Sequence, residues 1–172
     1  MKQFIITAFG EDRPGIVAKV SEILYKNGLN IEDSAMTRLN NEFVIMLVVK
    51  GNIDKNILEK DLKILEKENL TFTVKEIPVL EETQNENYQS CNIIVYGSDK
   101  PGIVYNVSKL LADKSINIAD LRTEKTKDLY VMFIQAELPE NVDISDLERE
   151  IENLKSSLNV DISIQNVDTA NL

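Results

Sequence analysis

The sequence predicts an α+β protein made of two similar modules, each with the element order β-α-β-β-α-β. The first observation behind this prediction is an internal repeat, because a shift of 87 residues lays residues 10–33 over residues 97–120 without a gap. The second is that strand-like and helix-like patterns follow one another in this order in each half. The third is a polar stretch, residues 78–90, which is typical of a linker.

The repeat contains two kinds of residue. Its identical pairs are Gly10/Gly97, Asp12/Asp99, Pro14/Pro101, Gly15/Gly102, Ile16/Ile103, Val17/Val104, Val20/Val107, Ser21/Ser108, Leu24/Leu111, Asn30/Asn117, Ile31/Ile118 and Asp33/Asp120. Some of them form an apolar helical face, and the others form a polar frame around a turn. The pattern therefore indicates that the fold and the geometry of a site were duplicated together.

In the first half, residues 4–9 are β-prone and end at a glycine, which predicts a strand. Apolar residues at helical spacing follow, and they predict a helix that starts near Pro14 and ends at Gly28. Residues 29–39 and 42–49 predict a hairpin around a tight Asn-Asn turn. The second of these strands is apolar without alternation, which indicates a central strand in a covered sheet.

A second helix is expected from a cap at Asp54 to about Glu68, followed by a strand at residues 70–77. Its inward residues are expected to be Ile57, Leu58, Leu62 and Leu65.

The second half repeats this order. Strands are expected at residues 91–97, 116–124, 129–137 and 160–167, with a first helix at residues 101–114. The second helix has the clearest amphipathic spacing, through Ile144, Leu147, Ile151, Leu154 and Leu158. This is the ferredoxin-like plan, in which two helices cover one face of a four-stranded antiparallel sheet. The predicted domains are residues 1–77 and 91–172, joined by the linker 78–90, with their sheets expected side by side.

Composition narrows the function. The net charge is −10, and residues 91–172 carry 8 basic against 14 acidic side chains. Neither half has the basic stripe that binds nucleic acid, so we expect no direct contact with DNA or RNA. No apolar run approaches the roughly 20 residues of a membrane span. The start of the chain lacks the pattern of a signal peptide, so a cytoplasmic protein is expected.

The residues of enzyme and metal sites are scarce. The chain has no histidine and a single cysteine, Cys91. It therefore lacks the commonest general base and cannot form a disulfide within the chain or a Cys/His metal site. We expect no catalytic residue, no metal and no cofactor.

The turn between the first strand and the first helix is the feature with chemical potential. Its backbone N–H groups lie at a helix N-terminus and favour an anion such as a carboxylate. Arg13 and Lys100 could add positive charge there, while Asp12 and Asp99 could accept from an ammonium group. Asp-X-Pro-Gly also makes a turn and a helix start without any ligand, and this structural interpretation stays open.

Asn30 and Asn117 open the strand after the first helix in each half. Their amides offer both a donor and an acceptor, which suit the polar ends of an amino acid. The same residues could serve only as helix-to-strand turns.

These motifs, Asp-Arg-Pro-Gly-Ile-Val and Gly-Leu-Asn-Ile-Glu-Asp in the predicted topology, resemble the ACT domain, a regulatory module that commonly binds amino acids. The tandem pair is similar to proteins related to the glycine cleavage system transcriptional repressor. This resemblance implies a homodimeric regulator without catalysis, which binds an amino-acid effector near module interfaces and acts through a transcription factor or a metabolic enzyme. The effector-binding residues it implies are Asp12, Arg13, Pro14, Gly15, Ile16, Val17 and Asn30, with Asp99, Lys100, Gly102, Ile103, Val104 and Asn117 in the second module.

Two residues depart from the pattern of the first module. Lys100 stands in place of arginine, and Ser115 stands where the first module has Gly28. Whether both sites bind an effector therefore stays open. The alternative function is a pure interaction module, in which exposed sheet edges mediate dimerisation or docking and the Pro-Gly turns are structural.

Overall fold

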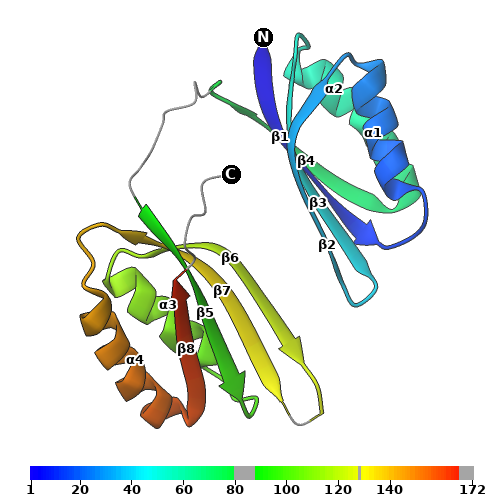
Figure 1. Cartoon of the computed structure of the whole chain (residues 1–172). Helices are drawn as coiled ribbons and strands as arrows, with labels where there is room; N and C mark the ends of the chain where they lie inside the picture. Colours follow the sequence, from blue (N-terminus) through cyan, green and yellow to red (C-terminus); the bar gives the residue numbers. More distant parts are fainter. Residues whose placement is uncertain (80–87, 128, 167–172) are drawn as a thin grey trace. The chain divides into compact units, whose positions relative to one another are not determined.

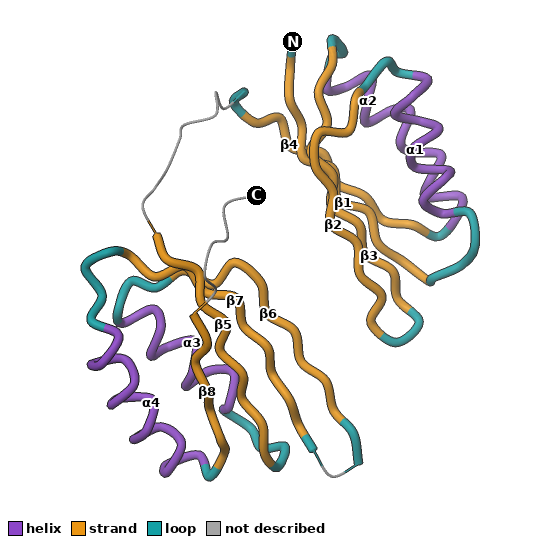
Figure 2. The backbone as a smooth tube through the Cα atoms, in the orientation of Figure 1, coloured by secondary structure: helices purple, strands orange, loops and turns teal. Residues whose placement is uncertain are grey.

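The computed structural model describes residues 1–79, 88–127 and 129–166. The chain divides into two compact units, Met1–Thr83 and Gln84–Leu172, which we call module 1 and module 2. Each unit is an antiparallel four-stranded sheet with helices on one face (Figure 1, Figure 2). The predicted fold class of each module is thereby confirmed.

The elements follow the predicted order. Module 1 contains β1 (Lys2–Glu11), α1 (Ile16–Lys26), β2 (Asn30–Leu39), β3 (Glu42–Gly51), α2 (Lys55–Leu62), the 3-10 helix η1 (Lys63–Glu68) and β4 (Leu70–Ile77). Module 2 contains β5 (Tyr88–Gly97), α3 (Ile103–Asp113), β6 (Asn117–Lys125), β7 (Tyr130–Pro139), α4 (Ile144–Leu158) and β8 (Val160–Asn166). The last residue predicted for the final strand, Val167, lies outside the described residues.

The sheets have the strand orders β2-β3-β1-β4 and β6-β7-β5-β8. Each module has its own hydrophobic core between the sheet and its helices, which includes Phe4, Ile6 and Leu24 in module 1 and Ile93, Leu111 and Met132 in module 2. No helix within the described ranges is both long and apolar enough to cross a membrane.

The first helix of each module starts two residues later than the sequence predicts. Gly15 adopts the left-handed conformation with φ 93°, and Gly102 does so with φ 96°. A residue in this conformation cannot continue a right-handed helix back to the proline, so α1 and α3 begin at Ile16 and Ile103.

The second helix of module 1 differs from the prediction in two ways. Asp54 caps α2 as expected, because its side chain accepts a hydrogen bond from the Asn56 backbone N–H at 2.9 Å. However, the α-helix ends at Leu62 and continues as the 3-10 helix η1. Ile57, predicted to face inward, is 53% exposed, whereas Leu58 is fully buried. The prediction is therefore wrong for Ile57 and confirmed for Leu58.

Strand β3 occupies an inner position, as predicted, but its sheet is covered on one face only. Its buried residues alternate with exposed or half-buried ones, and Met46 is 47% exposed. Phe9 of β1 is 43% exposed on the same side. Helices therefore cover one face of this sheet, as the ferredoxin-like plan predicts, and the apolar residues of β3 on the other face have no helix over them within module 1. We call the face without helices the open face.

Strand β5 begins at Tyr88, three residues before the predicted strand start at Cys91. Tyr88 pairs with Pro139 and Ser90 with Glu137, so the added residues lengthen the ladder with β7. Pairing with a neighbouring strand, rather than the composition of the segment, decides where this strand starts. Much of the remaining predicted linker, residues 80–87, lies outside the described residues.

Candidate functional site

The strand-to-helix turn of module 1 leaves the start of α1 without a side-chain cap. The Asp12 backbone N–H donates to the Asn41 carbonyl at 2.7 Å, which ties the turn to the β2–β3 hairpin. Gly15 then stands at the N-cap position, and no side chain accepts from the first turn of the helix. The second helices differ, because Asp54 and Asp143 cap α2 and α4. The first N–H groups of α1 are therefore available to an anion.

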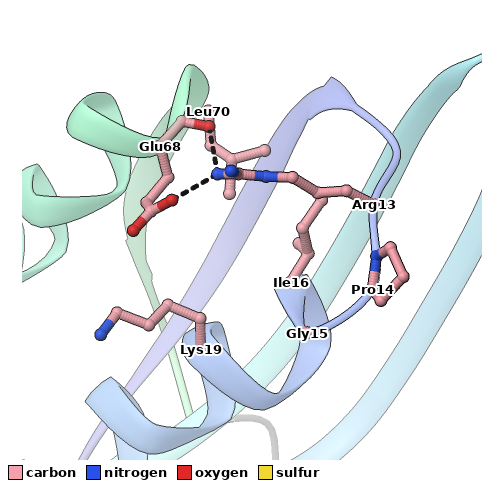
Figure 3. A pocket seen from close by; sticks show the side chains of 7 residues that line it. All are labelled: Arg13, Pro14, Gly15, Ile16, Lys19, Glu68 and Leu70. Carbon is pink, nitrogen blue, oxygen red and sulfur yellow. Dashed lines mark hydrogen bonds and ion pairs between the residues drawn. The ribbon is translucent and has the colours of Figure 1, made fainter.

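A small cavity lies beside this helix start (Figure 3). Its volume is about 210 Å³, and its lining residues are Arg13, Pro14, Gly15, Ile16, Lys19, Glu68 and Leu70. The first four of these were predicted from the sequence, so the structure gathers them at one cavity. The sequence motif did not indicate the other three. Lys19 lies one turn along α1, Glu68 ends η1 and Leu70 begins β4.

Glu68 forms a hydrogen bond and an ion pair with Arg13. The guanidinium donates to the Glu68 backbone carbonyl at 2.7 Å and to its Oε2 atom at 2.5 Å (Figure 3). Both side chains are more than a third exposed, at 46% and 39%. An ion pair this exposed contributes little to stability, so an anionic ligand can compete with Glu68 for the guanidinium.

The two charges of the turn contact different partners. Asp12 pairs with Arg38 of β2 at 3.4 Å, whereas Arg13 pairs with Glu68. Module 2 repeats the first of these contacts, because Lys125 pairs with Asp99 at 2.5 Å. Arg38 and Lys125 are related by the same shift of 87 residues, so the repeat could have revealed them as further turn residues.

Module 2 does not reproduce the contact of Arg13. Gly10 pairs with Leu70 and Gly97 with Val160, so the position that corresponds to Glu68 is Leu158. Lys100 accordingly forms no ion pair with any residue that the structure describes. The cavity at this end of module 2, about 400 Å³, is lined by Gly97, Ser98 and residues of α4 and β8, and by none of the predicted site residues.

The asparagines lie at the other end of their modules. Asn30 pairs with Lys50 of β3, whereas Gly10, where the turn begins, pairs with Phe43. Seven residues of an extended strand span roughly 23 Å, so Asn30 cannot share a small ligand with the turn of its own module.

Each asparagine amide has an acidic neighbour. The Asn30 side-chain amide donates to Glu32 at 2.6 Å, and that of Asn117 donates to Glu137 at 2.7 Å. The sequence predicted both asparagines as site residues, but the structure does not bring either of them to a turn within one module.

The apolar residues of the predicted sites divide into two groups. Ile16 and Ile103 are buried and belong to the two cores, while Val17 and Val104 are 43% and 40% exposed. In module 2 the Asn106 amide also donates to the Gly102 carbonyl at 2.8 Å. The isoleucines therefore hold the helix starts in place, and the valines are available at the surface.

Cys91 is buried, and the carboxylates of the described residues do not gather as a metal site requires. Cys91 is fully buried in β5, and burial raises the pKa of its thiol to about 11. Among the described residues, no cluster of three or more cysteine or carboxylate side chains could hold a metal ion. The buried thiol is protonated at neutral pH and packs as a small core residue.

The sequence pattern of the ACT domain matches residues 2–75 and 92–165. Over 167 residues the chain is 26% identical to the glycine cleavage system transcriptional repressor of Escherichia coli. The alignment covers 93% of this chain and 87% of that protein. A UPF0237 protein of Methanococcus maripaludis is 40% identical over 74 residues, 42% of this chain and 82% of the relative.

A crystal structure of an unknown protein from Galdieria sulphuraria has the same fold, with a TM-score of 0.82, 24% sequence identity, and 96% and 98% of the two chains covered. The match to both halves, together with the two β-α-β-β-α-β modules and their duplicated turns, shows that this chain belongs to the ACT domain family and carries two ACT domains in tandem.

Proposed function

We propose that this protein is a non-catalytic regulator whose ACT modules bind a small effector, an amino acid, and transmit its presence to a protein partner. The observation that carries the proposal is the uncapped start of α1 beside a cavity that contains Arg13 and Lys19. Helix N–H groups and a guanidinium together suit a carboxylate. The cavity of about 210 Å³ is smaller than the sites of drug-sized ligands, which favours a small effector.

The ammonium end of the effector requires a second group of partners. Asp12 lies on the β2 side of the turn and is engaged by Arg38. β2 is an edge strand whose residues are all exposed, so it can pair with the β2 strand of a second copy. If the two strands pair in antiparallel register, Asn30 of one copy comes beside the Asp12 end of the other. We therefore propose that the effector bridges the turn of one module and the asparagine of its neighbour in a homodimer.

The effect on gene expression or metabolism would require a protein partner. The Escherichia coli relative is named as a transcriptional repressor of the glycine cleavage system. This chain carries a net charge of −10 and no basic stripe that could neutralise phosphates. We therefore propose that it acts on amino-acid metabolism by contacting a transcription factor or a metabolic enzyme in the cytoplasm, rather than by binding DNA.

A thermal-shift screen of the full chain against the twenty amino acids tests effector binding. The proposal expects a selective rise in melting temperature that grows with concentration. Calorimetric titration then compares Arg13→Ala with Lys26→Ala, which also removes one exposed ion-paired cation but at the far end of α1. Arg13→Ala should weaken binding about tenfold or more, and Lys26→Ala should not. Equal affinity in both variants would place the effector elsewhere.

The bridging arrangement has its own test. Asn30→Ala combined with Asn117→Ala should weaken binding of the effector and lower the ligand-dependent association of the chain. Unchanged affinity in this double variant would refute the bridge, while leaving the site at Arg13 in place.

The second candidate function is an interaction module without a ligand. The exposure of β2 along its whole length favours it, because an unpaired edge strand can pair with another protein directly. The screen separates the two functions. An interaction module should show no amino-acid-dependent change in melting temperature or oligomeric state.

A further inference from the structure

The open face of module 1 is apolar in its middle. On this face, Phe9 of β1 and Met46 of β3 are 43% and 47% exposed. The strand registers place three more apolar residues around them, Ile5, Val44 and Val48, together with the small or neutral side chains Thr7, Ala35, Thr37, Thr71 and Thr73. All the helices of the module pack against the other face (Figure 2). The patch is therefore contiguous and is not covered by module 1 itself.

The two ends of the open face carry opposite net charge. Glu11 and Glu42 lie opposite each other on β1 and β3 at the acidic end. Toward the other end lie Lys50, Lys75 and one acidic residue, Asp33, so the net charge there is positive. None of these five charged side chains forms an ion pair with another described residue of the chain. A surface of this kind is complementary to itself when one copy is turned end to end over another.

We propose that the open face of module 1 packs against the same face of a second copy of this chain. The two sheets lie face to face about a two-fold axis that runs across the strands, which sets Met46 against its counterpart at the centre. The acidic end of each copy then lies over Lys50 of the other. Packed sheets cross at about 30°, and the length of a lysine side chain accommodates the offset at the ends.

The small area of the face favours a weak association. Four strands about 4.8 Å apart, over the roughly 27 Å from Gln3 to Glu11, present a flat area of roughly 500 Å² per copy. The total of roughly 1,000 Å² is at the lower end of specific interfaces. We therefore expect a dimer that dissociates in the micromolar range, on a surface separate from the β2 edge.

Module 2 does not share this complementarity. Its open face also has apolar residues, Ile94, Tyr96, Val131 and Phe133, with Tyr96 and Phe133 each 44% exposed. However, the charges at both ends are acidic, with Glu124 and Asp161 toward one end and Asp120 and Glu137 toward the other. The one basic residue that the registers place on this face, Arg122, lies opposite Phe133 in the middle and pairs with Asp120 of its own strand. The same end-to-end packing would set acidic groups against acidic groups. The proposed interface is therefore specific to module 1.

Sedimentation of the full chain over a range of concentrations, in the absence of amino acids, tests the proposal. Met46→Lys places two positive charges together at the centre of the interface, so it should weaken dimerisation by at least about tenfold. Ile57→Lys is the matched control, because Ile57 is 53% exposed and lies on α2, away from both the open face and the β2 edge. Equal weakening by both substitutions, or by neither, would overturn the proposal.

A charge exchange provides a second test that does not depend on the central residue. Glu42→Lys and Lys50→Glu should each weaken dimerisation, because each sets like charges against one another. An equimolar mixture of these two variants should associate more tightly than either alone. The double variant should recover most of the original affinity. Failure of both the mixture and the double variant to recover association would refute the end-to-end arrangement.

Discussion

Ser115 and Gly28 occupy the same position of the two modules and provide a direct test of backbone strain. Gly28 has φ 65° and Ser115 has φ 58°, so both residues adopt the left-handed conformation. The turns also make matching hydrogen bonds, from Gly28 N–H to Tyr25 O at 3.0 Å and from Ser115 N–H to Ala112 O at 2.9 Å. The difference between the modules at this position is therefore a side chain on a backbone that favours glycine.

Ser115→Gly should stabilise module 2 by about 1 kcal/mol. A left-handed residue with a Cβ atom costs about 1–2 kcal/mol. Glycine also gives the unfolded chain more conformational freedom, which offsets about 0.4–1 kcal/mol of the gain. The Ser115 side chain is exposed, so little packing is lost with it. A gain of about 1 kcal/mol lowers the population of unfolded module about fivefold.

Cys91 provides the assay, because it is the chain's single thiol and lies fully buried in β5. A thiol reagent reacts with Cys91 only when module 2 unfolds. When refolding is faster than labelling, the labelling rate is proportional to the population of unfolded module 2. Ser115→Gly should slow labelling about fivefold. Ser115→Ala keeps the Cβ atom and should not slow it. Equal slowing in both variants, or none in Ser115→Gly, would refute the argument from backbone strain.

Three further substitutions test contacts of the two modules. Gly10→Ala should destabilise module 1 and deform the cavity at α1, because its Cβ atom would lie 2.5 Å from the Asn69 carbonyl oxygen; urea unfolding and effector titration measure the two effects. Asp143→Ala removes the cap of α4 and should cost about 1 kcal/mol, read as faster labelling of Cys91. A hydrogen bond from Lys114 lowers the pKa of Asp146 below its ordinary value of 3.8. The ionised Asp146 therefore stabilises the fold fully at pH values above 3.8, and this contribution is lost as the pH falls through the lower pKa of the folded state. Urea unfolding should therefore show a smaller loss of stability in acid for Asp146→Asn than for the native chain; an equal loss would show that other groups control acid unfolding.

The elements of the fold follow from patterns within short stretches of sequence. Apolar spacing predicted each helix and strand, and Asp54 was correctly expected to cap the second helix. The errors have two origins. Pairing with β7, a neighbour in space, extends β5 to Tyr88. The late start of α1 has a local cause, because Gly15 directly after the proline is left-handed. Ile57 has the spacing of a core residue but is 53% exposed.

The candidate site likewise combines residues that the sequence motif indicates with residues that only the fold brings together. The duplicated motif identified Arg13 and the glycine at the start of α1, since a repeat preserves residues whose positions matter together. It did not indicate Glu68, which contacts Arg13 from 55 residues away and has no counterpart in module 2. It also suggested that Asn30 belongs with the turn, whereas the strand register places the two at opposite ends of the module.

The sequence by itself determined the two modules, the order of their elements and the chemistry of the duplicated turn, because these depend on neighbours within a few residues along the chain. Only the tertiary structure decided that Asp12 and Arg13 contact different partners, that a cavity lies beside the uncapped helix, and that no helix of module 1 covers the apolar open face of its sheet. These features depend on strand register and on packing between distant segments. Side-chain spacing along the chain does not specify such contacts.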